Sequence, residues 1–117
     1  MAEEMDEEFQ RRVEGILKEL MESNGMEVYG NLKIEVASMD TLALLKGNKI
    51  YINIEARKYP KNVLKYIIAH ELAHLMVKRH TRKFWEIVKR IYPEYEEGRI
   101  ELLNKAGKFI KNQHNLI

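Results

Sequence analysis

The chain has 117 residues, of which 45% are hydrophobic and 32% charged, so it is long enough for one modest hydrophobic core and is typical of a globular protein. Its net charge of +2 gives no reason to expect a nucleic-acid partner, and the absence of cysteine excludes disulfides, thiol nucleophiles and thiolate metal sites. The acidic start MAEEMDEEFQRR is unlike a signal peptide, and no apolar run approaches the roughly 20 residues of a membrane span, so we expect a cytoplasmic protein without a membrane partner.

The first half of the chain predicts one amphipathic helix followed by a small sheet. Over residues 1–24, apolar residues recur at steps of three and four, namely Phe9, Val13, Ile16, Leu17 and Leu20. Residues 27–56 alternate apolar and polar side chains in LKIEVAS and again in TLALLKGNKIYINIEA, where Gly47-Asn48 marks a turn between two strands. We therefore expect about three strands, and in the last of them the inward-facing residues are Ile50, Ile52 and Ile54.

The second half of the chain predicts helices. Pro60 suits the first turn of a helix over residues 60–80, because its missing N–H is not needed there. Residues 81–105 predict shorter helices, and residues 106–117 form a C-terminal tail that follows the last clear helical pattern. The segregation of strands and helices along the chain predicts a single α+β domain.

The stretch IIAHELAHLMVKRHTRKFW holds three of the chain's four histidines. His70 and His74 are four residues apart on the predicted helix, so their imidazoles share one face and can bind one metal ion. Glu71 lies about 100° further round the helix, where it can hydrogen-bond a water on that ion. Zinc held by neutral imidazoles lowers the pKa of its water from about 15.7 towards 7 and polarises a carbonyl. The pattern predicts a zinc endopeptidase in which Glu71 is the general base.

The same residues also fit an exposed polar helix face that has no function. The apolar stripe of this helix is made by other residues, which are Leu64, Ile68, Leu72 and Leu75. The histidines are therefore not needed for packing, and Ala69 and Ala73 suit close contact with neighbouring elements. For these reasons we adopt the interpretation as a metal site.

The third metal ligand stays open from the sequence. The next turn of the same helix offers Lys78, so the chain must bend before it supplies another donor. A bend before Thr81, which can cap the next helix, would bring His80 to the open side of the metal. If His80 is instead a surface residue at that corner, a downstream carboxylate replaces it, and the candidates are Glu86, Glu94, Glu97 and Glu101.

The run from Lys49 to about Leu103 resembles the small HExxH metallopeptidases of the SprT-like and WLM group, and also the minigluzincins, which are short archaeal peptidases. The likeness rests on KIYINIEA before the helix, on Pro60, on HELAH, and on His80 four residues before Phe84-Trp85. It implies a zincin-like fold, Zn²⁺, and a peptide or protein substrate held along an edge strand, either TLALLK or KIYINIE. The WLM likeness implies that His80 is the third ligand, whereas the gluzincin label implies a glutamate.

Two further expectations concern the surroundings of the site. Tyr95 is our candidate for stabilising the oxyanion, ahead of Tyr92 and His114. The tail KAGKFIKNQHNLI can fold into its own cleft, or into that of a second copy in a homodimer, and keep the enzyme latent. Minigluzincins are similar in being held as zymogens, and a frayed terminus is the alternative.

Two other functions compete with the peptidase. A metal-binding or peptide-binding module without turnover would not need Glu71. A DNA-associated protease of the SprT-like type would use a basic face, for which the sequence offers Lys78, Arg79, Lys83, Lys89 and Arg90. Because such runs are usually solvated helix faces, we expect no nucleic-acid partner.

Overall fold

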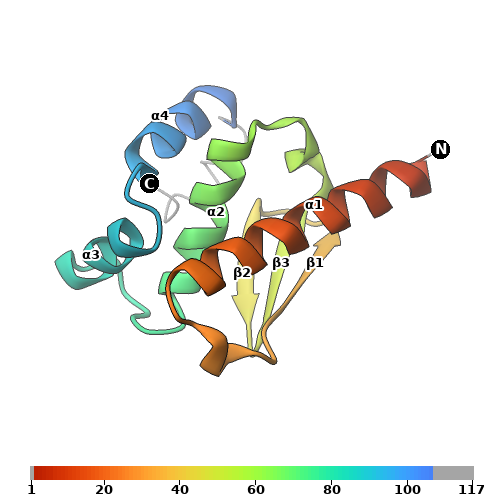
Figure 1. Cartoon of the computed structure of the whole chain (residues 1–117). Coiled ribbons are helices and arrows are strands. Elements are labelled where there is room, and N and C mark those ends of the chain that lie inside the picture. The colour runs from red at the N-terminus through yellow and green to blue at the C-terminus, as the bar shows by residue number, and fades with distance from the viewer. Residues whose placement is uncertain (1, 107–117) are drawn as a thin grey trace.

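A computed structural model describes residues 2–106 of the chain and places helices on both sides of a central helix, with a small sheet next to it (Figure 1). In chain order the elements are α1 (Ala2–Ser23), the 3₁₀ helix η1 (Glu27–Tyr29), β1 (Lys33–Ala37), β2 (Ala43–Lys46), β3 (Lys49–Asn53), the 3₁₀ helix η2 (Ile54–Lys58), α2 (Lys61–Ala73), α3 (Arg82–Ile91) and α4 (Tyr95–Lys105). The predicted α+β fold class is confirmed. None of the helices within residues 2–106 combines the length and apolar character needed to cross a membrane.

The three strands form a mixed sheet in the order β1-β3-β2. β3 pairs in parallel with β1, in the register Ile34↔Ile50 and Val36↔Ile52, and antiparallel with β2. The β2–β3 turn contains Gly47 at φ 62, a conformation that glycine adopts without strain. Because β3 is hydrogen-bonded on both sides, the suggestion that KIYINIE is an edge strand is wrong. The edges of this sheet are β1 and β2.

Helix α1 lies across the sheet with its apolar stripe in the core, as the sequence predicts. One side chain of α1 also reaches the outer edge of β1. Gln10 Nε2 donates to the carbonyl of Ile34 at 2.7 Å, and Gln10 Oε1 accepts from the N–H of Val36 at 2.8 Å. A residue of a parallel strand would make the same pair of bonds, so the Gln10 amide takes the place of a neighbouring strand at this edge.

Helix α2 is the central element of the molecule (Figure 1), with α1 and the sheet on one side and α3 and α4 on the other. Helix α4 approaches it closely at Gly98, where a Cβ atom would lie 2.4 Å from the carbonyl oxygen of Asn62 and 2.9 Å from Cβ of Tyr66. Nearby, Asn62 Nδ2 donates to Glu101 Oε1 at 3.0 Å. These contacts fix α4 against the first half of α2.

Two predicted boundaries are wrong. The helix expected over residues 60–80 ends at Ala73, because the following backbone tightens into turns in which Leu75 N bonds to Leu72 O and Met76 N bonds to Ala73 O. The expected run of strand also stops before Ile54, which lies half-buried in η2. The side chain of Asn53 accepts from the N–H of Glu55 at 3.0 Å and so begins that 3₁₀ helix.

Candidate metal centre

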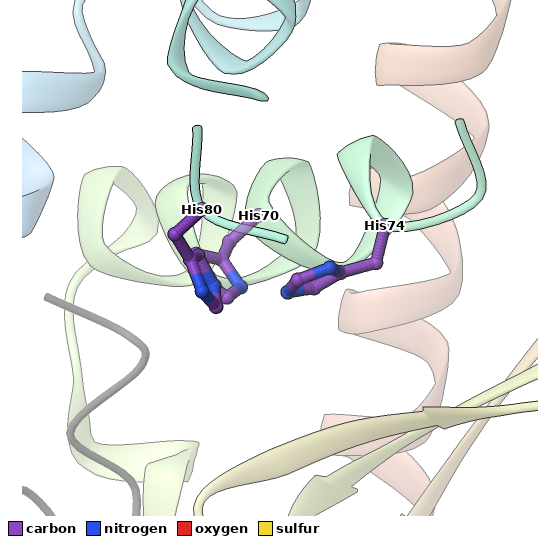
Figure 2. Close-up of side chains that lie close together, drawn as sticks. All are labelled: His70, His74 and His80. Carbon is purple, nitrogen blue, oxygen red and sulfur yellow. The ribbon is translucent and has the colours of Figure 1, made fainter. Parts of the chain in front are cut away.

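The structure brings His70, His74 and His80 together, and we call these three residues the histidine cluster (Figure 2). One ring nitrogen from each lies within 4.8 Å of the others. Nε2 of His70 lies 3.2 Å from Nε2 of His80. Within residues 2–106 no other group of three or more histidine, aspartate and glutamate side chains comes together in this way.

The end of α2 and the bend after it place the three imidazoles. His70 lies in the last turn of the helix and His74 is its C-terminal cap residue. The chain then turns back, and Thr81 caps α3 by accepting from the N–H of Phe84 at 3.4 Å. This bend carries His80 over His70, so that their rings stack with centroids 5.2 Å apart.

Phe84 forms the wall behind the cluster. Its ring is completely buried, and its centroid lies 5.1, 4.6 and 4.7 Å from those of His70, His74 and His80. A rigid aromatic ring in contact with all three imidazoles limits the rotamers available to them. The position of Phe84 therefore gives it a packing role at the bend between α2 and α3.

The second ring nitrogens of two histidines have partners of their own. Nδ1 of His74 lies 3.2 Å from the carbonyl oxygen of Val77, to which it can only donate, so its Nε2 is the nitrogen without a proton when the ring is neutral. Nδ1 of His70 lies 3.3 Å from Oε2 of Glu71. Burial lowers the pKa of His74, and the neighbouring His70 lowers it further, which favours the neutral form that a metal requires.

The donor set fits a transition-metal ion. Zinc–nitrogen bonds of about 2.0–2.1 Å in a tetrahedral arrangement separate two ligand nitrogens by about 3.3 Å. The 3.2 Å between His70 and His80 is close to that value, and His74 completes a group of three nitrogen donors that all lie within 4.8 Å of one another. Imidazole suits zinc, copper, iron and nickel, whereas calcium and magnesium prefer oxygen ligands.

The four glutamates considered as third ligands lie elsewhere. Glu86, Glu94 and Glu97 are exposed on α3 or at the start of α4. Glu101 is half-buried, but its carboxylate bonds to Asn62, two helical turns before His70. None of the four belongs to the group of converging donors.

Tyr95 lies beside the cluster and not within it. Its ring stacks on Trp85 and on Tyr66, with centroid distances of 6.0 and 6.4 Å. Burial raises the pKa of Tyr95, so the phenol stays protonated at neutral pH and remains a donor. The alternative Tyr92 packs against Lys65, whose ammonium lies 5.5 Å from its ring centre, and His114 falls outside the described residues.

The sequence reading missed two residues near the cluster, Tyr66 and Arg99. Tyr66 is fully buried, and its ring meets that of His70 in an edge-on arrangement with the two centroids 6.0 Å apart. Burial raises the pKa of its phenol, and the neighbouring Glu71 contributes in the same direction. Its position four residues before His70 on one helix face was a usable signal, whereas Arg99 comes from α4 and had none.

Comparisons with known proteins agree with this fold. A family model described as YgjP-like, metallopeptidase domain, matches residues 1–105. The crystal structure of the metallopeptidase zymogen of Pyrococcus abyssi abylysin is similar at a TM-score of 0.71 and 22% identity, covering 81% of this chain and 95% of that one. That of the zymogen of Methanocaldococcus jannaschii jannalysin is similar at 0.67 and 23%, covering 80% and 95%.

One similar protein is named for an activity other than peptide hydrolysis. The UTP pyrophosphatase of Escherichia coli K12 is 28% identical over an alignment of length 72 that covers 56% of this chain. The match spans 43% of the length of that protein, so the chain corresponds to less than half of it.

Proposed function

Since the chain belongs to the YgjP-like metallopeptidase domain family, we propose that it is a zinc-dependent endopeptidase whose metal ligands are His70, His74 and His80. One observation carries the assignment: three imidazole nitrogens converge within 4.8 Å beside the buried carboxylate of Glu71. We choose His80 over a glutamate as the third ligand. When bound, zinc supplies Lewis-acid polarisation of the scissile carbonyl and a water of lowered pKa.

Glu71 is the proposed general base. The residue is only 3% exposed, and it lies next to the cluster on the last turn of α2. A carboxylate there can take the proton from the attacking water and pass it to the leaving amine. The contact with His70 Nδ1 gives it a second task, because an acceptor at Nδ1 keeps the proton off Nε2.

Strand β2 is the proposed binding edge for substrate. It is an outer strand of the sheet and packs against α2, whose last turn and C-terminal cap supply His70 and His74 of the cluster. Gln10 already occupies hydrogen-bonding positions on the outer side of β1. An extended peptide would add to β2 through main-chain hydrogen bonds, with Tyr95 as a protonated donor to the oxyanion.

Latency through the tail is a further part of this proposal. Residues 107–117 lie outside the described residues, so support comes from the sequence and from the two similar structures, which are named zymogens. The tail would occupy the cleft of its own chain or of a second copy in a homodimer. Removal of residues 106–117 should then increase peptide hydrolysis, and unchanged activity would argue against latency.

Hydrolysis of a nucleoside triphosphate is the second candidate function, because the relative from Escherichia coli is named a UTP pyrophosphatase. The same metal and general base can serve attack on phosphorus instead of carbon. We prefer the peptidase because the matching family model, which covers residues 1–105, describes a metallopeptidase domain.

The test compares both substrates on one preparation. Quenched peptides, casein and UTP are offered to the zinc-loaded protein, to Glu71→Gln, to a chain ending at Lys105, and to Glu86→Gln. The last removes an exposed carboxylate from α3 and serves as the matched control. The proposal is supported if the unaltered protein hydrolyses peptides, Glu71→Gln does not, and Glu86→Gln still does. Hydrolysis of UTP alone would replace it with the second candidate, and turnover of neither substrate would favour a binding module.

A further inference from the structure

Arg99 brings a positive charge to the neighbourhood of the histidine cluster. Its guanidinium carbon lies 5.8 Å from the ring centre of Trp85. The ring centroid of Trp85 in turn lies 6.0 Å from that of His70 and 6.1 Å from that of His80. A single aromatic ring therefore connects this guanidinium to two of the three proposed ligands.

The charge of Arg99 also reaches the aromatic side chains around the cluster. It interacts electrostatically with the phenols of Tyr66 and Tyr95. These two rings stack on each other, and Tyr95 stacks on Trp85. Arg99 thus lies beside a series of aromatic rings, each in contact with the next, that extends to the histidine cluster.

The backbone that carries Arg99 is held rigidly. Its neighbour Gly98 lies so close to α2 that a Cβ atom would overlap the carbonyl oxygen of Asn62. The hydrogen bond from Asn62 to Glu101 closes the same contact from the other side of Arg99. A guanidinium carried on a fixed helix, with its central carbon 5.8 Å from the ring centre of Trp85, loses less freedom on binding a ligand than one on a mobile segment would.

We infer that Arg99 is a substrate-binding residue, and that it binds a carboxylate of the peptide close to the scissile bond. This inference rests on the proposed peptidase function. The planar guanidinium of arginine can pair with a carboxylate through two hydrogen bonds. Arg99 is partly exposed, so a carboxylate of a bound peptide can reach it. The residue gives the enzyme a preference for peptides with an acidic side chain or a free C-terminus near the cleavage point.

The kinetic test uses peptide pairs that differ in one carboxylate. Each pair has an acidic residue or its amide at one position, or a free or amidated C-terminus. We expect Arg99→Met to raise KM for the acidic member roughly 10-fold or more, since charged hydrogen bonds are lost, and to leave the neutral member within about 2-fold. Arg82→Met is the matched control, because Arg82 lies on α3 with its side chain 95% exposed. It should alter neither member.

A binding measurement gives a readout that does not depend on turnover. Trp85 is the only tryptophan of the chain, so its fluorescence reports directly on the ring beneath Arg99. In the Glu71→Gln background, the acidic peptide should change this fluorescence and bind more tightly than its neutral partner, and Arg99→Met should remove the difference. Arg99→Lys keeps the charge without the fork and should give an intermediate preference, which maintains the test if the methionine variant does not fold.

Several results would overturn the inference. Equal loss on both members of each pair would make Arg99 a structural residue, and no change in either would exclude contact with substrate. An effect confined to UTP would assign the guanidinium to a phosphate instead. If the unaltered protein cleaves no peptide, the peptidase proposal fails, yet a carboxylate-dependent fluorescence change that requires Arg99 would still support this site.

Discussion

Among the single residues, the partners of the second ring nitrogens determine how the imidazoles of the histidine cluster are oriented. The Nδ1 nitrogens of His70 and His74 meet Glu71 and the carbonyl of Val77, so both rings are oriented from behind. Such outer partners fix the tautomer and raise the basicity of a metal-binding imidazole. Under the proposed function, Glu71 would have two separable roles, as a base and as an acceptor for His70.

Substitution of Glu71 by glutamine and by alanine should separate these roles. Glutamine retains an acceptor oxygen for His70 Nδ1 but is not a base, so we expect zinc affinity within a few-fold of the unaltered protein and peptide hydrolysis lowered by about 100-fold or more. Alanine removes both functions and should also weaken zinc binding by about 10-fold. Chelator competition and initial rates measure the two effects. Full activity in the glutamine variant would show that another group is the base.

The identity of the third ligand is also a question at this scale. His80→Ala should weaken zinc binding by more than the roughly 10–100-fold that loss of an outer partner causes. Glu101→Gln is the matched control, since it alters the half-buried glutamate of α4 that bonds to Asn62. It should keep its zinc. Isothermal titration of the metal-free proteins measures both, and the reverse pattern would make Glu101 the ligand.

At the scale of elements, local patterns predict the pieces and not their arrangement. The stripe from Phe9 to Leu20 predicts α1, and the spacing of His70 and His74 predicts a shared helix face, because both follow from the helical repeat. The order β1-β3-β2 depends on contacts between distant residues. The end of α2 at Ala73 depends on the turns that follow it, which the helical repeat does not predict. For this reason the sequence left open whether His80 or a downstream glutamate joins His70 and His74.

The contact of α4 with α2 can be tested at Gly98. Gly98→Ala places a methyl group 2.4 Å from the carbonyl oxygen of Asn62, so α4 must shift, and we expect a loss of about 1–3 kcal/mol in the free energy of unfolding. Gly15→Ala is the matched control, because a Cβ there meets nothing within 4 Å in the middle of α1. It should stabilise by about 0.5–1 kcal/mol. Urea unfolding compares the two, and similar effects at both sites would contradict the close packing.

In the molecule as a whole, the histidine cluster lies where the end of α2 meets the segment that precedes α3. His70 and His74 belong to the end of α2, whereas His80 directly precedes α3, whose Phe84 lies against all three rings. A metal held there would connect the central helix to the bend and to α3. Metal binding and stability should therefore be coupled.

Zinc should raise the melting temperature. At a free zinc concentration of 100 times the dissociation constant, binding to the folded state alone contributes about 2.7 kcal/mol. For a chain of this length that is an increase of about 10 °C. Calorimetry with and without zinc measures it, and a chelator should reverse it. A shift of the same size in His80→Ala would mean that the metal binds elsewhere.

The most direct test of the central claim is an anomalous difference map, recorded on both sides of the zinc absorption edge from crystals of the zinc-loaded protein. We expect one zinc peak, about 2.0–2.1 Å from Nε2 of each of His70, His74 and His80. A peak bound by two of these histidines and a glutamate would contradict the assignment of His80. A peak away from all three, or none at full zinc saturation, would contradict the metal centre itself.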